Sequence, residues 1–199
     1  MVHTFSAVSR DAWGRRWSAV LFTLMTGIAG SAVGFLASLV GNAVTRTIPI
    51  MPTSRLALVV VVGAAITSST ELGWTHIHFP QRDRQVPSAW RARFGRSTTA
   101  AAYGLLLGGA VLTRIPYATT YFFLVVAAVS GTTIGIMLGM LYGISRGLAS
   151  ALPSMLIEGE LVPEVTEQLM RLGPAVRYAN GTYLATIAFG MVTLLLTNA

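Results

Sequence analysis

Five stretches of the chain are long and almost entirely apolar, and the polar residues gather between them. They cover about residues 18–44, 56–73, 98–113, 118–144 and 180–197. A helix needs about 20 apolar residues to cross a hydrocarbon core of ~30 Å, so each stretch is long enough, or nearly so, to cross one. The pattern predicts an all-α fold in which residues 1–199 form a single transmembrane domain, a polytopic helical bundle of about five spans.

The polar residues lie mainly in two long segments, 74–97 and 145–179, which we expect to be cytoplasmic loops. Within the second loop, Pro163–Leu172 is typical of a short helix, with Gly173-Pro174 as its stop. Its early turns are acidic, which favours a protein over anionic lipid as its partner. The tight turn Arg114–Tyr117 predicts that the third and fourth spans are antiparallel neighbours.

The distribution of arginine predicts the orientation. All 14 basic residues are arginine, as is typical of a GC-rich bacterial genome, and the formal net charge is +7. If the two long loops and the N-terminus share one face, the other face carries Arg46, Arg55 and Arg114 alone. Positively charged loops stay in the cytoplasm, so the N-terminus is expected inside and the C-terminus outside. This predicts a multi-pass protein of the bacterial cell (inner) membrane.

Composition narrows the function further. Hydrophobic residues make up 53% of the chain and charged residues 11%, which leaves no sizeable soluble domain. There is no cysteine, which excludes a disulfide, a thiol relay and a thiolate metal site. Basic charge in such a chain indicates topology and lipid headgroup contact, so no nucleic-acid partner is expected. The first stretch has no small-residue cleavage site after it and is interpreted as a retained anchor.

The sharpest pattern is a run of five glycines at a spacing of four in the fourth stretch. The glycines are Gly131, Gly135, Gly139, Gly143 and Gly147. Helices in lipid associate by close backbone approach, and glycine lacks the side chain that would prevent it. Two other stretches offer matching small residues at the same spacing, which are Gly30, Gly34 and Ser38 in the first stretch and Ala100, Gly104 and Gly108 in the third.

Two interpretations of this glycine zipper remain open. In one, the three helices pack within one subunit. In the other, the glycines face a second copy or another membrane protein, either as a permanent interface or as a sliding surface in a transporter.

Glu71 is the clearest ionisable candidate inside an apolar stretch, where such groups are costly. It could protonate, hold a cation or pair with an arginine; alternatively, it ends the span in an interfacial ion pair. His76 and His78 could offer two imidazoles to a metal, but further ligands would have to come from Glu71 and Asp83. Interfacial histidines are the ordinary interpretation, so no metal and no cofactor are expected. Arg114 could reach the outer headgroups or hold an anion.

The arginine-rich loop is expected to contact lipid headgroups or a partner. The residues concerned are Arg82, Arg84, Trp90, Arg91, Arg93 and Arg96. The chain has no H-E-x-x-H, G-x-S-x-G or P-loop motif, which disfavours catalysis by this chain alone.

A resemblance covers about residues 82–148. Arg84-Gln85-Val86 with Trp90, then Tyr103-Gly104, Leu107-Gly108-Gly109, Thr113, Tyr121 and the glycine run to Arg146-Gly147, resembles small uncharacterised polytopic membrane proteins of actinobacteria. Some of these carry cytochrome-biogenesis-like or exporter-like labels. A thiol relay implied by the first label conflicts with the absence of cysteine, and the resemblance assigns no functional residue.

Three functions are compatible with these patterns. The preferred hypothesis is an integral membrane subunit of a larger assembly, in contact with lipids and with another membrane protein or further copies of itself. The second is a small homo-oligomeric transporter or channel with Glu71 or Arg114 near the path. The third is an intramembrane enzyme that acts on a lipid or hydrophobic peptide at the cytoplasmic interface through Glu71, His76 and the arginines of the loop.

Overall fold

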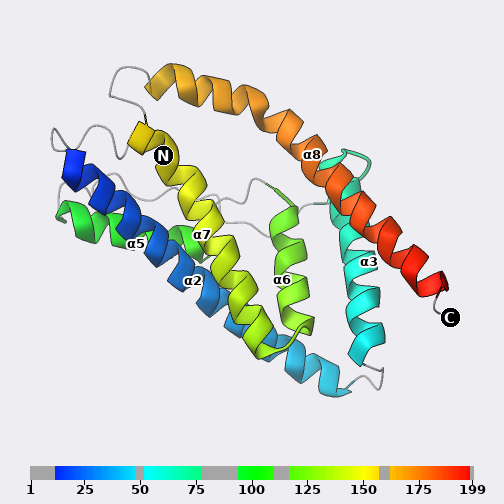
Figure 1. The fold of residues 1–199 in the computed structure, drawn as a ribbon. Coiled ribbons are helices and arrows are strands. Elements are labelled where there is room, and N and C mark those ends of the chain that lie inside the picture. The colour runs from blue at the N-terminus through cyan, green and yellow to red at the C-terminus, as the bar shows by residue number, and fades with distance from the viewer. Residues whose placement is uncertain (1–11, 48–51, 78–93, 110–116, 157–161, 198–199) are drawn as a thin grey trace. The chain divides into compact units, whose positions relative to one another are not determined.

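The computed structural model describes residues 12–47, 52–77, 94–109, 117–156 and 162–197. Over this part of the chain the regular elements are six α-helices (Figure 1). In chain order they are α2 (Ala12–Thr47), α3 (Pro52–Glu71), α5 (Arg96–Gly108), α6 (Thr119–Val129), α7 (Thr132–Leu156) and α8 (Val162–Thr197). The predicted all-α class is confirmed.

Two of the described helices are long and apolar enough to cross a membrane. The stretches are Arg16–Val44 within α2 and Thr132–Ala151 within α7. Two shorter apolar helices cover Ala57–Glu71 and Thr119–Val129.

The predicted fourth span, 118–144, is not one helix. Helix α6 ends where the Ser130 N–H donates to the Val126 carbonyl at 3.0 Å, and Gly131 follows with a φ of 86°. A left-handed residue after the last turn is the usual way a helix ends, and glycine adopts it without strain. Helix α7 then starts at Thr132, and the two are separate rods in Figure 1. With 11 residues, α6 is only about 16 Å long.

Segment 145–179, expected to be a loop with one short helix at Pro163–Leu172, contains more helix than predicted, and the predicted stop at Gly173-Pro174 is wrong. Helix α7 continues to Leu156, and α8 begins at Val162 and runs through Gly173 and Pro174 without a break. A proline inside a helix removes one backbone hydrogen bond and costs ~3 kcal/mol, which is why it was expected to stop the helix. Membrane helices tolerate such a proline when neighbouring groups satisfy the freed carbonyl.

The described helices belong to two compact units, and α2, α7 and α8 each contribute to both. The first unit comprises Met1–Val33, Gln81–Arg114 and Met140–Leu172. Its core joins α2, α5 and α7 through Ala19, Phe22, Ala100, Tyr103, Leu107 and Ala151. Gly104 lies at Phe22 and Met25 of α2, and Gly108 lies further along at Thr26 and Ala29, so α5 runs parallel to α2.

The second unit comprises Gly34–Pro80, Ile115–Gly139 and Gly173–Ala199. Its core joins α3, α6 and α8 through Ala64, Phe122 and Leu184, with Val60, Val126 and Ala188 packed against them. Asn42 near the end of α2 donates to Thr132 at the start of α7 at 3.3 Å. In this unit α6 and α8 both run antiparallel to α3, and α7 runs antiparallel to α2.

Candidate functional site

Two glycines of the glycine zipper, Gly143 and Gly147 of α7, lie directly against α2 in the first unit. A Cβ atom added to Gly143 would overlap the Thr26 carbonyl oxygen and lie 3.0 Å from the Gly27 Cα. A Cβ added to Gly147 would lie 3.0 Å from the Thr23 Cα. Because these neighbours are backbone atoms, no side-chain movement would relieve the contact. The backbones of α7 and α2 therefore approach as closely as glycine allows.

The same helices meet in the second unit through further small residues. A Cβ added to Gly34 would overlap the Gly135 carbonyl oxygen and lie 3.1 Å from the Gly139 Cα. One added to Gly135 would lie 3.0 Å from the Ser38 Cβ and 2.9 Å from the Ala127 carbonyl oxygen of α6. Both helices thus contribute glycine to the contact.

The remaining predicted packing glycines divide between contact and open space. Gly104 and Gly108 of α5 approach the α2 backbone at Phe22 and Thr26, and Gly30 is buried in α2. Gly131 differs, because a Cβ added there would meet nothing within 4 Å. Gly131 instead forms the turn between α6 and α7. The contacts observed along the glycine zipper are contacts between helices of one chain.

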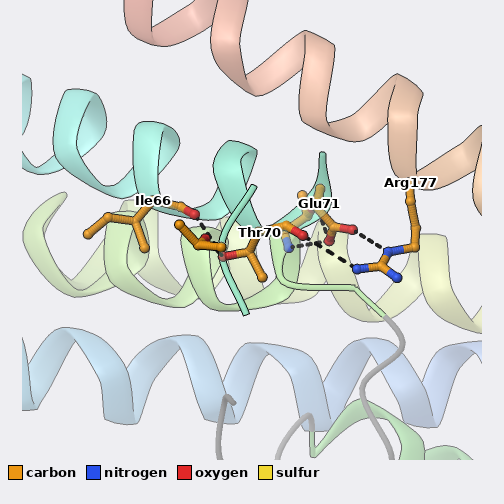
Figure 2. Close-up of polar contacts among 6 residues, drawn as sticks. Ile66, Thr70, Glu71 and Arg177 are labelled. Atoms are coloured by element: carbon orange, nitrogen blue, oxygen red, sulfur yellow. Dashed lines mark hydrogen bonds and ion pairs between the residues drawn. The ribbon is translucent and has the colours of Figure 1, made fainter. Parts of the chain in front are cut away.

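The second candidate is the buried carboxylate of Glu71, at the last residue of α3. Its side chain is 1% exposed, and its Oε2 lies 3.2 Å from Nε of Arg177 on α8. Figure 2 shows Arg177 reaching from α8 to this carboxylate and to the end of α3, where its Nη2 donates to the Thr70 carbonyl at 3.4 Å. The other carboxylate oxygen accepts from the backbone N–H of Thr119 at 3.3 Å.

The Thr119 contact has an electrostatic reason. Thr119 is the first residue of α6, and the N-cap residue Ala118 has no side chain that can accept a hydrogen bond. Helix N-termini carry unsatisfied N–H groups and a partial positive charge, so a carboxylate is favourable there. At the C-terminus of its own helix a carboxylate is unfavourable, and the positive end of α6 and Arg177 offset that cost. Glu71 therefore joins three helices at one point.

The hydroxyls next to Glu71 separate into two kinds. Thr67 donates to the Gly63 carbonyl at 2.6 Å and Thr70 to the Ile66 carbonyl at 2.9 Å, so both bond back to their own helix. Ser68 instead donates to the Gly181 carbonyl of α8 at 2.8 Å. A Cβ added to Gly181 would lie 2.8 Å from Leu72 Cγ, so this is another close approach.

The predicted spans 56–73 and 118–144 run in the same direction, which would put Glu71 and Thr119 at opposite ends of the bundle, but the structure places them in hydrogen-bond contact. The error follows from treating 118–144 as one span that enters from outside. Because α6 turns into α7 at Gly131, α6 starts at the end of α3 where Glu71 lies.

Other predicted site residues are less informative. His76 is exposed after the end of α3. His78 and Asp83 lie outside the described residues, as do Arg82, Arg84, Trp90, Arg91 and Arg93 of the arginine-rich loop and Arg114. Arg96 is the first residue of α5. Within the described ranges, no group of three His, Cys, Asp or Glu side chains is placed to hold a metal ion.

Comparison with known proteins gives no match: no family model fits the chain, and no curated protein or solved structure is similar to it. Functional inference therefore depends on the geometry of this chain.

Proposed function

We propose that this chain is an integral subunit of a larger assembly in the bacterial inner membrane, with about five spans, the N-terminus inside and the C-terminus outside. The described apolar helices support lipid as their surroundings. Only 33% of the residues in the most apolar 18-residue window of α2 are buried. The corresponding window of α7 has 28% of its residues buried. A core helix of a water-soluble protein would be mostly buried. Side chains such as Leu36, Met137 and Leu141 are 59–64% exposed and suit hydrocarbon.

Helix direction in the second unit supports a chain that reverses at each helix of this unit, with different members from those predicted, although α6 with 11 residues is too short to cross ~30 Å of hydrocarbon by itself. Along the chain, the segments of α2, α3, α6, α7 and α8 in this unit alternate in direction. Glu71 at the end of α3 and Thr119 at the start of α6 then lie on the same, cytoplasmic face.

The observation that carries the proposal is the uncovered face of α8. Seven small or hydroxyl residues line the side of α8 opposite Gly181 and Leu184, and all are exposed: Ala175, Ala179, Thr182, Thr186, Gly190, Thr193 and Thr197. A Cβ added to Gly190 would meet nothing within 4 Å. Thr182 and Thr186 donate to carbonyls four residues earlier, so neither hydroxyl needs water. Small residues are typical of helix–helix interfaces in membranes, which supports a partner helix on this face.

Cysteine cross-linking in native membranes tests the proposal, because the chain has no cysteine of its own. Thr186→Cys on the small-residue face, labelled with a maleimide that carries a photoreactive group, is expected to give a product larger than one chain on illumination. Leu195→Cys is the control, since Leu195 is 46% exposed on the opposite side of the helix. If neither variant gave a cross-linked product and the chain were recovered from mild detergent as a lone monomer, the proposal would be contradicted.

A homo-oligomeric transporter is the second candidate, and the carboxylate of Glu71 favours it. Ionisable groups buried in membrane helices commonly mark ion or proton paths. Flux in liposomes that contain only this protein, abolished by Glu71→Gln, would support transport over a subunit role. Among the described residues, no contact favours the enzyme hypothesis over these two.

A further inference from the structure

The second half of α8 is held to its unit along a single line of residues. Arg177 meets Glu71, Gly181 meets Ser68 and Leu72, and Leu184 packs with Ala64 and Phe122. These positions are three or four residues apart, so they form one narrow stripe on α8. The opposite side of the helix is exposed. Among the described residues, the ion pair is the one charged contact along this stripe.

Helices α3 and α6 have contacts of their own that do not involve α8. Phe122 of α6 lies at Gly63 of α3, where an added Cβ would be 3.4 Å from the ring, and Val60 and Val126 pack near the same cluster. The Thr119 N–H also bonds Glu71 directly. Helices α3 and α6 therefore share apolar and polar contacts that do not depend on α8.

We propose that Glu71, Arg177 and Thr119 form a latch that fixes residues 173–197 of α8 on α3 and α6, and that withdrawal of Arg177 releases this part of α8 while α3 and α6 stay packed. The latch is a conformational device built into the second unit.

The two sides of the ion pair differ in a way that suits release. The Glu71 side chain is 1% exposed and the Arg177 side chain 50% exposed. An acidic group outside the chain can therefore reach Arg177 but not Glu71. When Arg177 leaves, the carboxylate still accepts the Thr119 N–H at the positive end of α6, so α6 remains capped. The neutral contact from Ser68 to Gly181 is then the remaining hydrogen bond described between α3 and α8.

The consequence for assembly rests on the proposed function, since the small-residue face of α8 is the surface proposed to meet a partner. A fixed α8 presents that face in one orientation, and a released α8 does not. The release itself is a property of the single chain and holds whether or not a partner exists.

Distance measurements between paired spin labels test the latch in the cysteine-free chain. One label pair, Val62→Cys with Phe189→Cys, spans α3 and α8 at sites that are 46% and 75% exposed. The control pair, Val62→Cys with Val125→Cys, spans α3 and α6, where Val125 is 44% exposed. In the parent protein in lipid, both pairs are expected to give narrow distance distributions.

Arg177→Gln is expected to broaden the α3–α8 distribution and shift it to longer distances while the α3–α6 distribution stays narrow. Arg177→Lys, which keeps a charge for Glu71, is expected to lie between Arg177→Gln and the parent. An unchanged α3–α8 distribution in Arg177→Gln, or equal broadening of both pairs, would overturn the latch. If Arg177→Gln broadens the α3–α8 distribution as expected but Thr186→Cys gives no cross-link, the proposed function is contradicted and the latch is not.

Discussion

At the scale of single residues, Glu71 shows why a costly buried charge can persist. Its carboxylate lies at the unfavourable end of α3, yet it meets a guanidinium and the first N–H of another helix. Removing one partner of a buried ion pair usually destabilises more than replacing both, because the remaining charge is left uncompensated. The exposure of Arg177 lets solvent or headgroups share that compensation and reduces the cost. The pair therefore acts on the local position of α8 rather than on the stability of the whole fold.

Gly143 and Gly190 allow a matched test of close helix packing. Gly143→Ala would place its Cβ against the Thr26 carbonyl and 3.0 Å from the Gly27 Cα, so we expect a loss of about 1–3 kcal/mol from overpacking. Gly190→Ala meets open space and replaces glycine in a helix, so it should be neutral or stabilise by up to about 1 kcal/mol. Unfolding by SDS titration in mixed micelles, followed by circular dichroism, measures both. Equal stability of the two variants would contradict the assigned contact.

At the scale of elements, the apolar pattern predicts where helices lie better than where they end. The stretches 18–44 and 56–73 correspond to α2 and α3 because an apolar run with few charges has few alternatives. Hydropathy did not reveal the break at Ser130–Gly131, since two small residues hardly change the average. Conversely, Gly173-Pro174 looked like a stop, although α8 continues through it. In both cases local backbone geometry, rather than apolar content, decided the boundary.

The turn between α6 and α7 makes a prediction about backbone conformation alone. Gly131 has a φ of 86°, and a Cβ there would meet no atom within 4 Å. The cost of substitution is then conformational, about 1–2 kcal/mol for alanine and more for a β-branched residue. In the same SDS titration, we expect stability at position 131 to decrease in the order glycine, asparagine, alanine and valine. Alanine as stable as glycine would indicate that α6 and α7 join as one continuous helix.

At the scale of the whole molecule, sequence identified one half of the charged site and missed the other. Glu71 was found because a carboxylate in an apolar stretch is conspicuous. Arg177 lies 106 positions away and was assigned to a loop, and the N–H of Thr119 leaves no trace in a pattern of side chains. Long-range pairing depends on helix direction, and the direction of α6 was inverted by the missed turn. One local error therefore moved an entire contact to the wrong face.

The direction of α6 gives a sharp topological test. Tyr117 precedes α6 at the end of α3 that carries Glu71, so Tyr117→Cys should react with a membrane-impermeant maleimide from the same side as Thr75→Cys. Thr133→Cys, near the start of α7, should react from the opposite side, because the bond between Asn42 and Thr132 places it at the far end of α2. Intact cells and inverted vesicles distinguish the two faces. If Tyr117→Cys reacted together with Thr133→Cys, α6 would run the other way, the contact with Glu71 would be lost, and the five alternating passes would fail with it.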